Sequence, residues 1–140
     1  VPGQPVAKGR ARMSTRGGFI RSYTPEKTRK YEAQVSHYAT QAMRQSGCEI
    51  FEGPVSVHVQ AAMAIPESWS KKKRESAQQL IIWPISRPDL DNIIKAALDG
   101  INEVVFADDS QVVKLSGSKL YSANPQLTVT IEEVGKEPGR

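Results

Sequence analysis

Cysteine is nearly absent from this chain of 140 residues, because Cys48 is its single cysteine. One cysteine excludes an intramolecular disulfide and a cysteine-rich zinc site. The composition therefore favours a reducing compartment, and we expect a cytoplasmic protein. No signal peptide is recognisable, although the chain begins at Val1 rather than at methionine, which leaves room for a short leader or tag before it.

Long apolar runs and aromatic residues are also scarce. No run approaches the roughly 18 apolar residues of a membrane span, so we expect no membrane-spanning segment. Aromatic residues make up 6% of the chain, which predicts an aliphatic core. Hydrophobic residues make up 39%, slightly lean for an isolated domain of this length, and a dimer would bury more. Neither His37 nor His58 has a companion at metal-ligand spacing.

Positive charge is plentiful and unevenly placed. Residues 1–30 hold eight lysines and arginines against Glu26 alone, and a second cluster occupies residues 71–74. Such segments attract polyanions, of which nucleic acid is the commonest in a cell, but they also suit a solvated face and a flexible arm. The residues we predict to contact DNA are Lys8, Arg10, Arg12, Arg16, Lys71, Lys72, Lys73, Arg74 and Arg87.

The order of the elements predicts an α+β fold, with a mixed sheet flanked by helices in one domain spanning residues 1–134. Residues 135–140 read as a frayed tail. The first segment has a hairpin pattern with its turn at Gly17 and Gly18. Thr24 and Pro25 are typical of a helix start, with Thr24 as the N-cap and Pro25 at the first helical position, and Gly47 is typical of a helix stop.

Later elements follow from the spacing of apolar residues. Val55, Val57, Val59 and Ala61 alternate as in a strand. A polar helix is expected over 68–79, followed by a connector or short strand over 80–85. A central helix begins at Asp89 or Asp91 and ends near 101 or 102. Its predicted buried stripe consists of Leu90, Ile93, Ile94, Ala97, Leu98 and Ile101. Two strands follow over 111–121 and 126–134.

Acidic residues concentrate in one stretch. Residues 87–109 hold six acids and two bases, a net charge of −4 in a chain whose overall charge is +4. Mg²⁺ prefers hard oxygen ligands and commonly takes one or two carboxylates together with water and phosphate oxygens. Asp89 and Asp91 enter a helix, whereas Asp108 and Asp109 enter a strand, so both pairs converge on one or two metal ions if these elements pack together. Lys95 lies one helical turn after Asp91 and is suited to stabilise phosphate charge.

A purely structural interpretation of these acids also fits. Acids in the first turn of a helix favour its macrodipole, and Asp is a good N-cap. Asp91 and Lys95 have the spacing of an ordinary helical ion pair. The Asp108-Asp109-Ser110 sequence is common in turns. Spacing alone therefore leaves both interpretations open.

The motifs resemble one family along most of the chain. Residues 88–100 read PDLDNIIKAALDG, and residues 105–115 read VFADDSQVVKL. Together with PVAKGRAR at 5–12 and YTPEKTRKYE at 23–32, they closely resemble Holliday junction resolvases of the RusA type, found in bacteria and their prophages. Ala11 departs from the usual proline of that family, and both neighbouring arginines remain.

This resemblance implies a homodimeric endonuclease of a bacterial or phage-infected cell that cuts four-way DNA junctions with Mg²⁺, for which Mn²⁺ substitutes. It implies metal ligation by Asp89, Asp91 and Asp109, with Asp108 a less certain member, and an important role for Lys95. Asp99 matches a family acid with a supporting role. Two alternatives remain: a junction-binding protein without catalysis, and a metal-dependent nuclease acting on flaps or forks.

Overall fold

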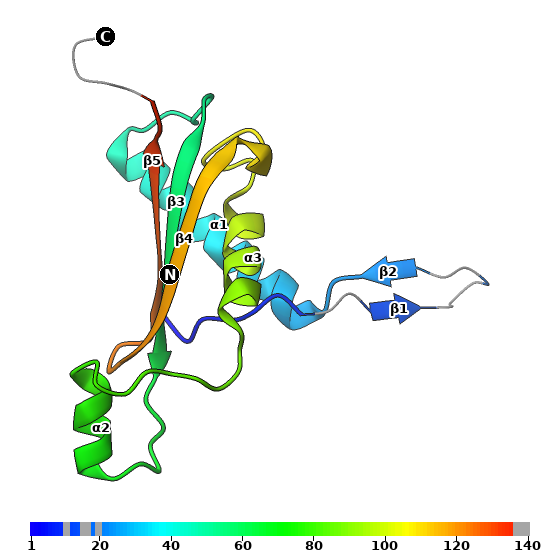
Figure 1. Cartoon of the computed structure of the whole chain (residues 1–140). Helices are drawn as coiled ribbons and strands as arrows, with labels where there is room; N and C mark the ends of the chain where they lie inside the picture. Colours follow the sequence, from blue (N-terminus) through cyan, green and yellow to red (C-terminus); the bar gives the residue numbers. More distant parts are fainter. Residues whose placement is uncertain (10–11, 15–17, 19–20, 136–140) are drawn as a thin grey trace.

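The computed structural model describes residues 1–9, 12–14, 18 and 21–135. Its main sheet has the strand order β4-β3-β5, formed by β3 (Val55–Ala64), β4 (Val112–Ser122) and β5 (Gln126–Glu133) (Figure 1). β3 pairs in parallel with β4 and antiparallel with β5. A parallel neighbour requires a crossover, which here carries α2 (Lys71–Gln78) and α3 (Leu90–Ile101). The expected α+β fold with a mixed sheet is therefore confirmed.

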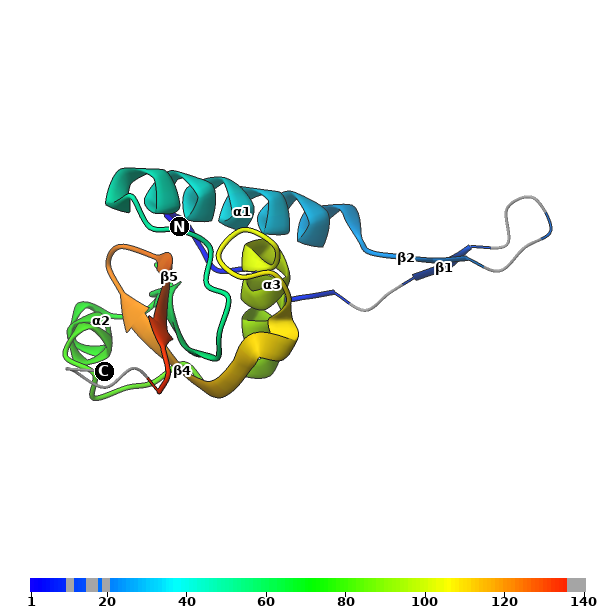
Figure 2. The ribbon, with the colours of Figure 1, turned by 90° about the horizontal axis from the view of Figure 1, so that it is seen from above.

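Two helices cover one face of this sheet. The long helix α1 (Glu26–Ser46) crosses over α3, and both contribute to the core beneath them (Figures 1 and 2). The helices approach closely at Gly100, where an added Cβ would lie 2.6 Å from the Cβ of Val35. α3 also lies close to the sheet at Gly117, where an added Cβ would lie 2.8 Å from Cδ1 of Ile94.

The core follows the alternation of β3. Val55, Val57, Val59 and Ala61 are fully buried, as their period of two predicts, while His58 between them is exposed. Phe106 is the largest fully buried side chain, and most of the remaining core is aliphatic. The expectation of a mainly aliphatic core is thus confirmed, with Tyr31, Phe106 and Tyr121 as its buried aromatic residues.

The N-terminal segment is bonded to both β5 and α1. Val1 exchanges backbone hydrogen bonds with Leu127 of β5, and the backbone N–H of Gly9 donates to Oγ1 of the buried Thr28 at 2.9 Å. β1 (Arg12–Ser14) and β2 (Arg21–Tyr23) then pair antiparallel and lie away from the main sheet (Figures 1 and 2). The hairpin is confirmed, whereas most of its turn lies outside the described residues.

Two predicted helix starts were wrong. α1 begins at Glu26 because Pro25 is extended, with ψ 146°, and no side chain caps this end, so Thr24 is not the N-cap. α2 begins at Lys71 rather than near Ser68. Its cap is Ser70, whose hydroxyl accepts from the backbone N–H of Lys73. The predicted stop of α1 is confirmed, since Gly47 has φ 66°.

The remaining predictions concern connections and the tail. Residues 80–85 form a connector and no strand. Residues 136–140 of the predicted tail lie outside the described residues. In the described part of the chain, no helix is both long and apolar enough to cross a membrane.

Candidate functional site

The first acidic pair lies at the amino end of α3. Asp89 is the N-cap residue and makes no side-chain cap bond, while Asp91 lies in the first turn. Both are exposed, and Oδ1 of Asp91 accepts from the backbone N–H of Asn92 at 2.9 Å. Among the described residues, neither carboxylate forms an ion pair, so the alternative Asp91–Lys95 pair is not formed. Two carboxylates and a lysine thus face solvent together.

The packing of α3 explains this orientation. Ile93, Ala97 and Ile101 are buried as predicted, which turns Asp91 and Lys95 outward. The predicted stripe also includes Leu90, Ile94 and Leu98, which are partly buried. Gly100 and Ala96 are buried as well and were not predicted, because they contact neighbouring elements rather than extend the apolar stripe.

The segment before α3 is held by a lysine of the sheet. Nζ of Lys119 in β4 donates to the carbonyl oxygens of Ser86, at 2.8 Å, and Pro88, at 2.9 Å. These bonds fix the backbone immediately before Asp89. The sequence offered no signal for this contact, since Lys119 lies 31 residues from Pro88.

The second acidic pair precedes β4. Asp108 caps the short 3₁₀ helix η2 (Asp109–Gln111), and its carboxylate accepts from the backbone N–H of Ser110 at 3.1 Å. Hydrogen bonds from the Ser110 side chain and backbone lower the pKa of Asp108. Asp109 is exposed, and in the described part of the chain its carboxylate has no ion-pair partner. The Asp108 carboxylate is therefore used to cap η2, and Asp109 is the better candidate for a metal ligand in this pair.

Gln111 anchors this second pair, a role that the motifs alone did not predict. Its Nε2 donates to the carbonyl oxygens of Phe51 and Gly53, both at 2.9 Å. Its Oε1 accepts from the backbone N–H groups of Ala107, at 2.9 Å, and Asp108, at 3.0 Å. An Asp followed three residues later by Gln is a capping-box pattern, and this signal was present in the sequence.

The two acidic pairs lie at opposite ends of α3. Asp89 precedes its first residue, whereas Phe106, just before the second pair, bridges to Asn102 at its carboxyl end (Figure 1). A helix of 12 residues is about 18 Å long. Accordingly, no group of three or more histidines, cysteines or acids among the described residues lies close enough to hold a metal ion. One chain does not bring the four predicted ligands together.

Lys8 forms two ion pairs within the fold. Its Nζ lies 2.6 Å from Oε1 of Glu32 in α1 and 2.9 Å from Oδ2 of Asp99 in α3. Burial lowers the pKa of Lys8, but the hydrogen bonds and charges of both carboxylates outweigh it and leave the pKa raised. Because two acids neutralise its charge, we expect Lys8 to contribute less to DNA binding than the other predicted contacts. Asp99 is one of these two acids, and its role in the family pattern stays a prediction.

The other predicted DNA contacts fall into three groups. Arg10 and Arg16 lie outside the described residues, and Arg12 belongs to β1. Arg87 and the cations of α2 are exposed. Nζ of Lys73 lies 4.0 Å from the ring centroid of Trp69, which packs edge-on against Tyr121 at 5.2 Å. Trp69 therefore links α2 to β4 through these two ring contacts.

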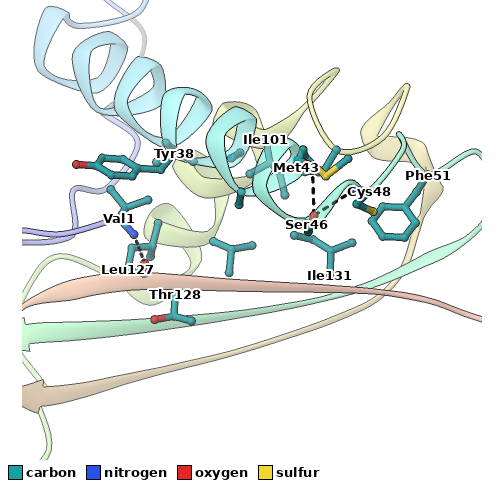
Figure 3. Close-up of a pocket in the computed structure, with 15 residues that line it drawn as sticks. Val1, Tyr38, Met43, Ser46, Cys48, Phe51, Ile101, Leu127, Thr128 and Ile131 are labelled. Atoms are coloured by element: carbon teal, nitrogen blue, oxygen red, sulfur yellow. Dashed lines mark hydrogen bonds between the residues drawn. The ribbon is translucent and has the colours of Figure 1, made fainter.

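A pocket of about 420 Å³ lies between α1 and β5 (Figure 3). Val1, Tyr38, Met43, Phe51 and Ile131 are among its lining residues, and of the described residues no Asp, Glu, Lys, Arg or His side chain lines it. Such a lining does not suit a metal ion or a phosphate. The pocket is therefore separate from the acidic pairs.

Comparison with known proteins identifies the family. The family described as Endodeoxyribonuclease RusA matches residues 2–132. The chain belongs to the RusA family. It is 40% identical over 136 residues to the uncharacterized protein YqaN of Bacillus subtilis (strain 168), covering 96% of this chain and 94% of that protein. It is also 38% identical over 53 residues to the crossover junction endodeoxyribonuclease rusA of Lactococcus phage r1t, covering 37% of this chain and 40% of that one.

Family membership decides the class of enzyme. RusA proteins are crossover junction endodeoxyribonucleases, which resolve Holliday junctions, so the chain is a nuclease of this class. This agrees with the resemblance drawn from the motifs at 88–100 and 105–115. The donor set also suits a RusA nuclease, because the free carboxylates of Asp89, Asp91 and Asp109 are hard oxygen ligands of the kind that Mg²⁺ prefers.

Proposed function

We propose that this chain is a Mg²⁺-dependent endonuclease that resolves four-way DNA junctions as a homodimer. The observation that carries the proposal is the amino end of α3, where Asp89 and Asp91 are exposed and free of ion pairs among the described residues. Lys95 follows Asp91 by one helical turn on the exposed side of the helix. Membership of the RusA family supports the junction as the substrate.

Asp89, Asp91 and Asp109 would hold the metal, which when bound supplies an activated water and neutralises charge on the phosphate. Water attacks phosphorus, the bond from phosphorus to O3′ breaks, and the O3′ group leaves with a proton. The products carry 5′-phosphate and 3′-hydroxyl ends. Lys95 would stabilise negative charge that develops on the phosphate oxygens. The exposed cations of α2 would bind the phosphates of a junction arm.

A second copy of the chain would complete each metal site. Magnesium ligands lie about 2.1 Å from the ion, so carboxylates at opposite ends of α3 do not share one. β4 is an edge strand that begins just after Asp109 and reaches Lys119, beside the segment that precedes Asp89. Two β4 edges pairing antiparallel about a two-fold axis would place Asp109 of each copy beside Asp89 and Asp91 of the other. Val113 and Leu115, exposed on β4, would be covered by this pairing.

The function is tested with Asp91→Asn protein on a synthetic four-way junction. We expect junction binding to persist and Mg²⁺-dependent cleavage to disappear, because an amide removes the ligand charge and keeps the shape. Glu103→Gln is the matched control, since Glu103 is an exposed acid of the same stretch. Undiminished cleavage by Asp91→Asn would exclude the metal assignment. If the unmodified protein cleaves flaps or forks faster than junctions, the substrate is a flap or fork rather than a four-way junction.

The shared site is tested by mixing two inactive variants, Asp91→Asn and Asp109→Asn. In a mixed dimer with shared sites, one site receives both substitutions and the other receives none, so single-strand nicking of the junction returns. If each copy builds its own site, every site in the mixture carries one substitution and nicking stays absent. The readout is nicks in a labelled junction after the two proteins have exchanged subunits.

A further inference from the structure

Gln111 uses its whole hydrogen-bonding capacity at one place in the fold. A glutamine side chain has two N–H donors and a carbonyl oxygen with two lone pairs. Here both donors meet backbone carbonyls, of Phe51 and Gly53, and the oxygen meets two backbone N–H groups, of Ala107 and Asp108. Four contacts of 2.9–3.0 Å from one side chain leave it a single orientation.

These contacts join two loops that are far apart in the sequence. Phe51 and Gly53 lie 60 and 58 residues before Gln111. Both belong to the segment that leads into β3, which is the central strand of the sheet. Ala107 and Asp108 lie in the loop that carries Asp109. The Gln111 side chain therefore joins the loop that carries Asp109 to the segment that leads into β3. Asp109 lies between two restrained residues, since Asp108 is bonded through its backbone N–H and Gln111 through its side chain.

We infer that Gln111 is a positioning residue for metal binding, which acts by fixing where the Asp109 carboxylate lies. This inference rests on the proposed function. Groups outside a metal's own ligands that hold those ligands in place typically change metal affinity about 10- to 100-fold when removed. Asp109 itself is exposed and has no ion-pair partner in the described part of the chain, so its backbone is what restrains it.

The first test compares Mn²⁺ affinity of the dimer by titration calorimetry in Gln111→Met and Gln4→Met. Gln4 is a matched control, because its Oε1 likewise accepts from a backbone N–H, that of Ala64 at 2.8 Å. We expect Gln111→Met to weaken Mn²⁺ binding about tenfold or more, and saturating Mn²⁺ to restore much of the cleavage rate. In metal-free Gln111→Met protein, the amide protons of Ala107 and Asp108 should exchange faster than in the unmodified protein. Gln4→Met should change neither the Mn²⁺ affinity nor the exchange of these amide protons.

The second variant, Gln111→Glu, separates geometry from charge. Its carboxylate keeps the two acceptor contacts but opposes the carbonyls of Phe51 and Gly53, which releases the loop from β3. An added negative charge would by itself tighten Mn²⁺ binding, so weaker binding supports displacement of Asp109. If Gln111→Met does not fold, this variant decides. Unchanged affinity in the folded variants, or tighter binding in Gln111→Glu, overturns the inference alone. Absence of Mn²⁺ binding by the unmodified dimer overturns the proposed function together with it.

Discussion

The ammonium group of Lys119 donates to the carbonyl oxygen of Pro88 at 2.9 Å, so a residue of the sheet sets the backbone position just before Asp89. The same group bonds the carbonyl of Ser86 at 2.8 Å. The first acidic pair is thus restrained from β4 much as Gln111 restrains the second pair from the approach to β3. Both restraints act on backbone, and among the described residues the carboxylates of Asp89 and Asp109 form no ion pair.

Replacing Lys119 by Met should weaken both stability and metal binding. The substitution removes two hydrogen bonds from a charged donor, each typically worth about 1.5–3 kcal/mol, although partial exposure places the expected loss at the lower end. Urea unfolding gives the stability change, and Mn²⁺ titration gives the affinity. Lys114→Met, an exposed lysine of the same strand, is the control. Equal effects of the two substitutions on Mn²⁺ affinity would argue against a role for Lys119.

Gly100→Ala should destabilise the fold by about 1–3 kcal/mol, the usual range for overpacking. The new methyl group would lie 2.6 Å from both Cβ and Cγ1 of Val35, so α1 and α3 would have to move apart. Gly53→Ala is a suitable control, because no atom lies within 4 Å of a Cβ added there. The measurement is the denaturation midpoint. A midpoint for Gly100→Ala that equals or exceeds the unmodified value would refute the close packing.

Stability should fall at alkaline pH for two named reasons. The pKa of Lys8 is raised in the fold, so its contribution is complete below its ordinary value of 10.5 and is lost as pH rises through the folded value. Burial raises the pKa of Tyr31 to about 12, so its ionisation in the unfolded chain favours unfolding above pH about 10. The contribution of these two groups to the free energy of unfolding should therefore be independent of pH below about pH 9 and should decline above it. Tyr31→Phe and Lys8→Met should each reduce the decline, and a decline of unchanged slope in both would contradict the assignment.

The α2 cations should set part of the salt dependence of junction binding. Substituting Lys71, Lys72 and Arg74 by Ala should lower the slope of log affinity against log salt by about 0.9 for each DNA phosphate that the protein no longer neutralises. Lys8→Met should leave the slope unchanged, because Glu32 and Asp99 already neutralise that charge. Fluorescence anisotropy with a labelled junction across several salt concentrations measures both. An equal change in slope for the two proteins would show that Lys8 contacts DNA despite its ion pairs.

Much of the fold was predictable because it depends on local periodicity. The alternation of Val55, Val57 and Val59 predicted β3, and the stripe of Ile93, Ala97 and Ile101 predicted α3 with its acids turned outward. The helix starts at Thr24 and Ser68 were wrong because backbone geometry at Pro25 and the cap at Ser70 decide them. These are choices over one or two residues that periodicity does not resolve.

The sequence by itself determined which residues carry the candidate carboxylates, and their order along the chain identified the family to which it belongs. Only the tertiary structure decided what those residues touch. It paired Lys8 with Glu32 and Asp99, joined Gln111 to Phe51 and Gly53, and set the two acidic pairs at opposite ends of α3. The physical reason is that hydrogen bonds and ion pairs act over a few ångströms, and only folding brings residues such as Gln111 and Phe51, 60 positions apart, within that range.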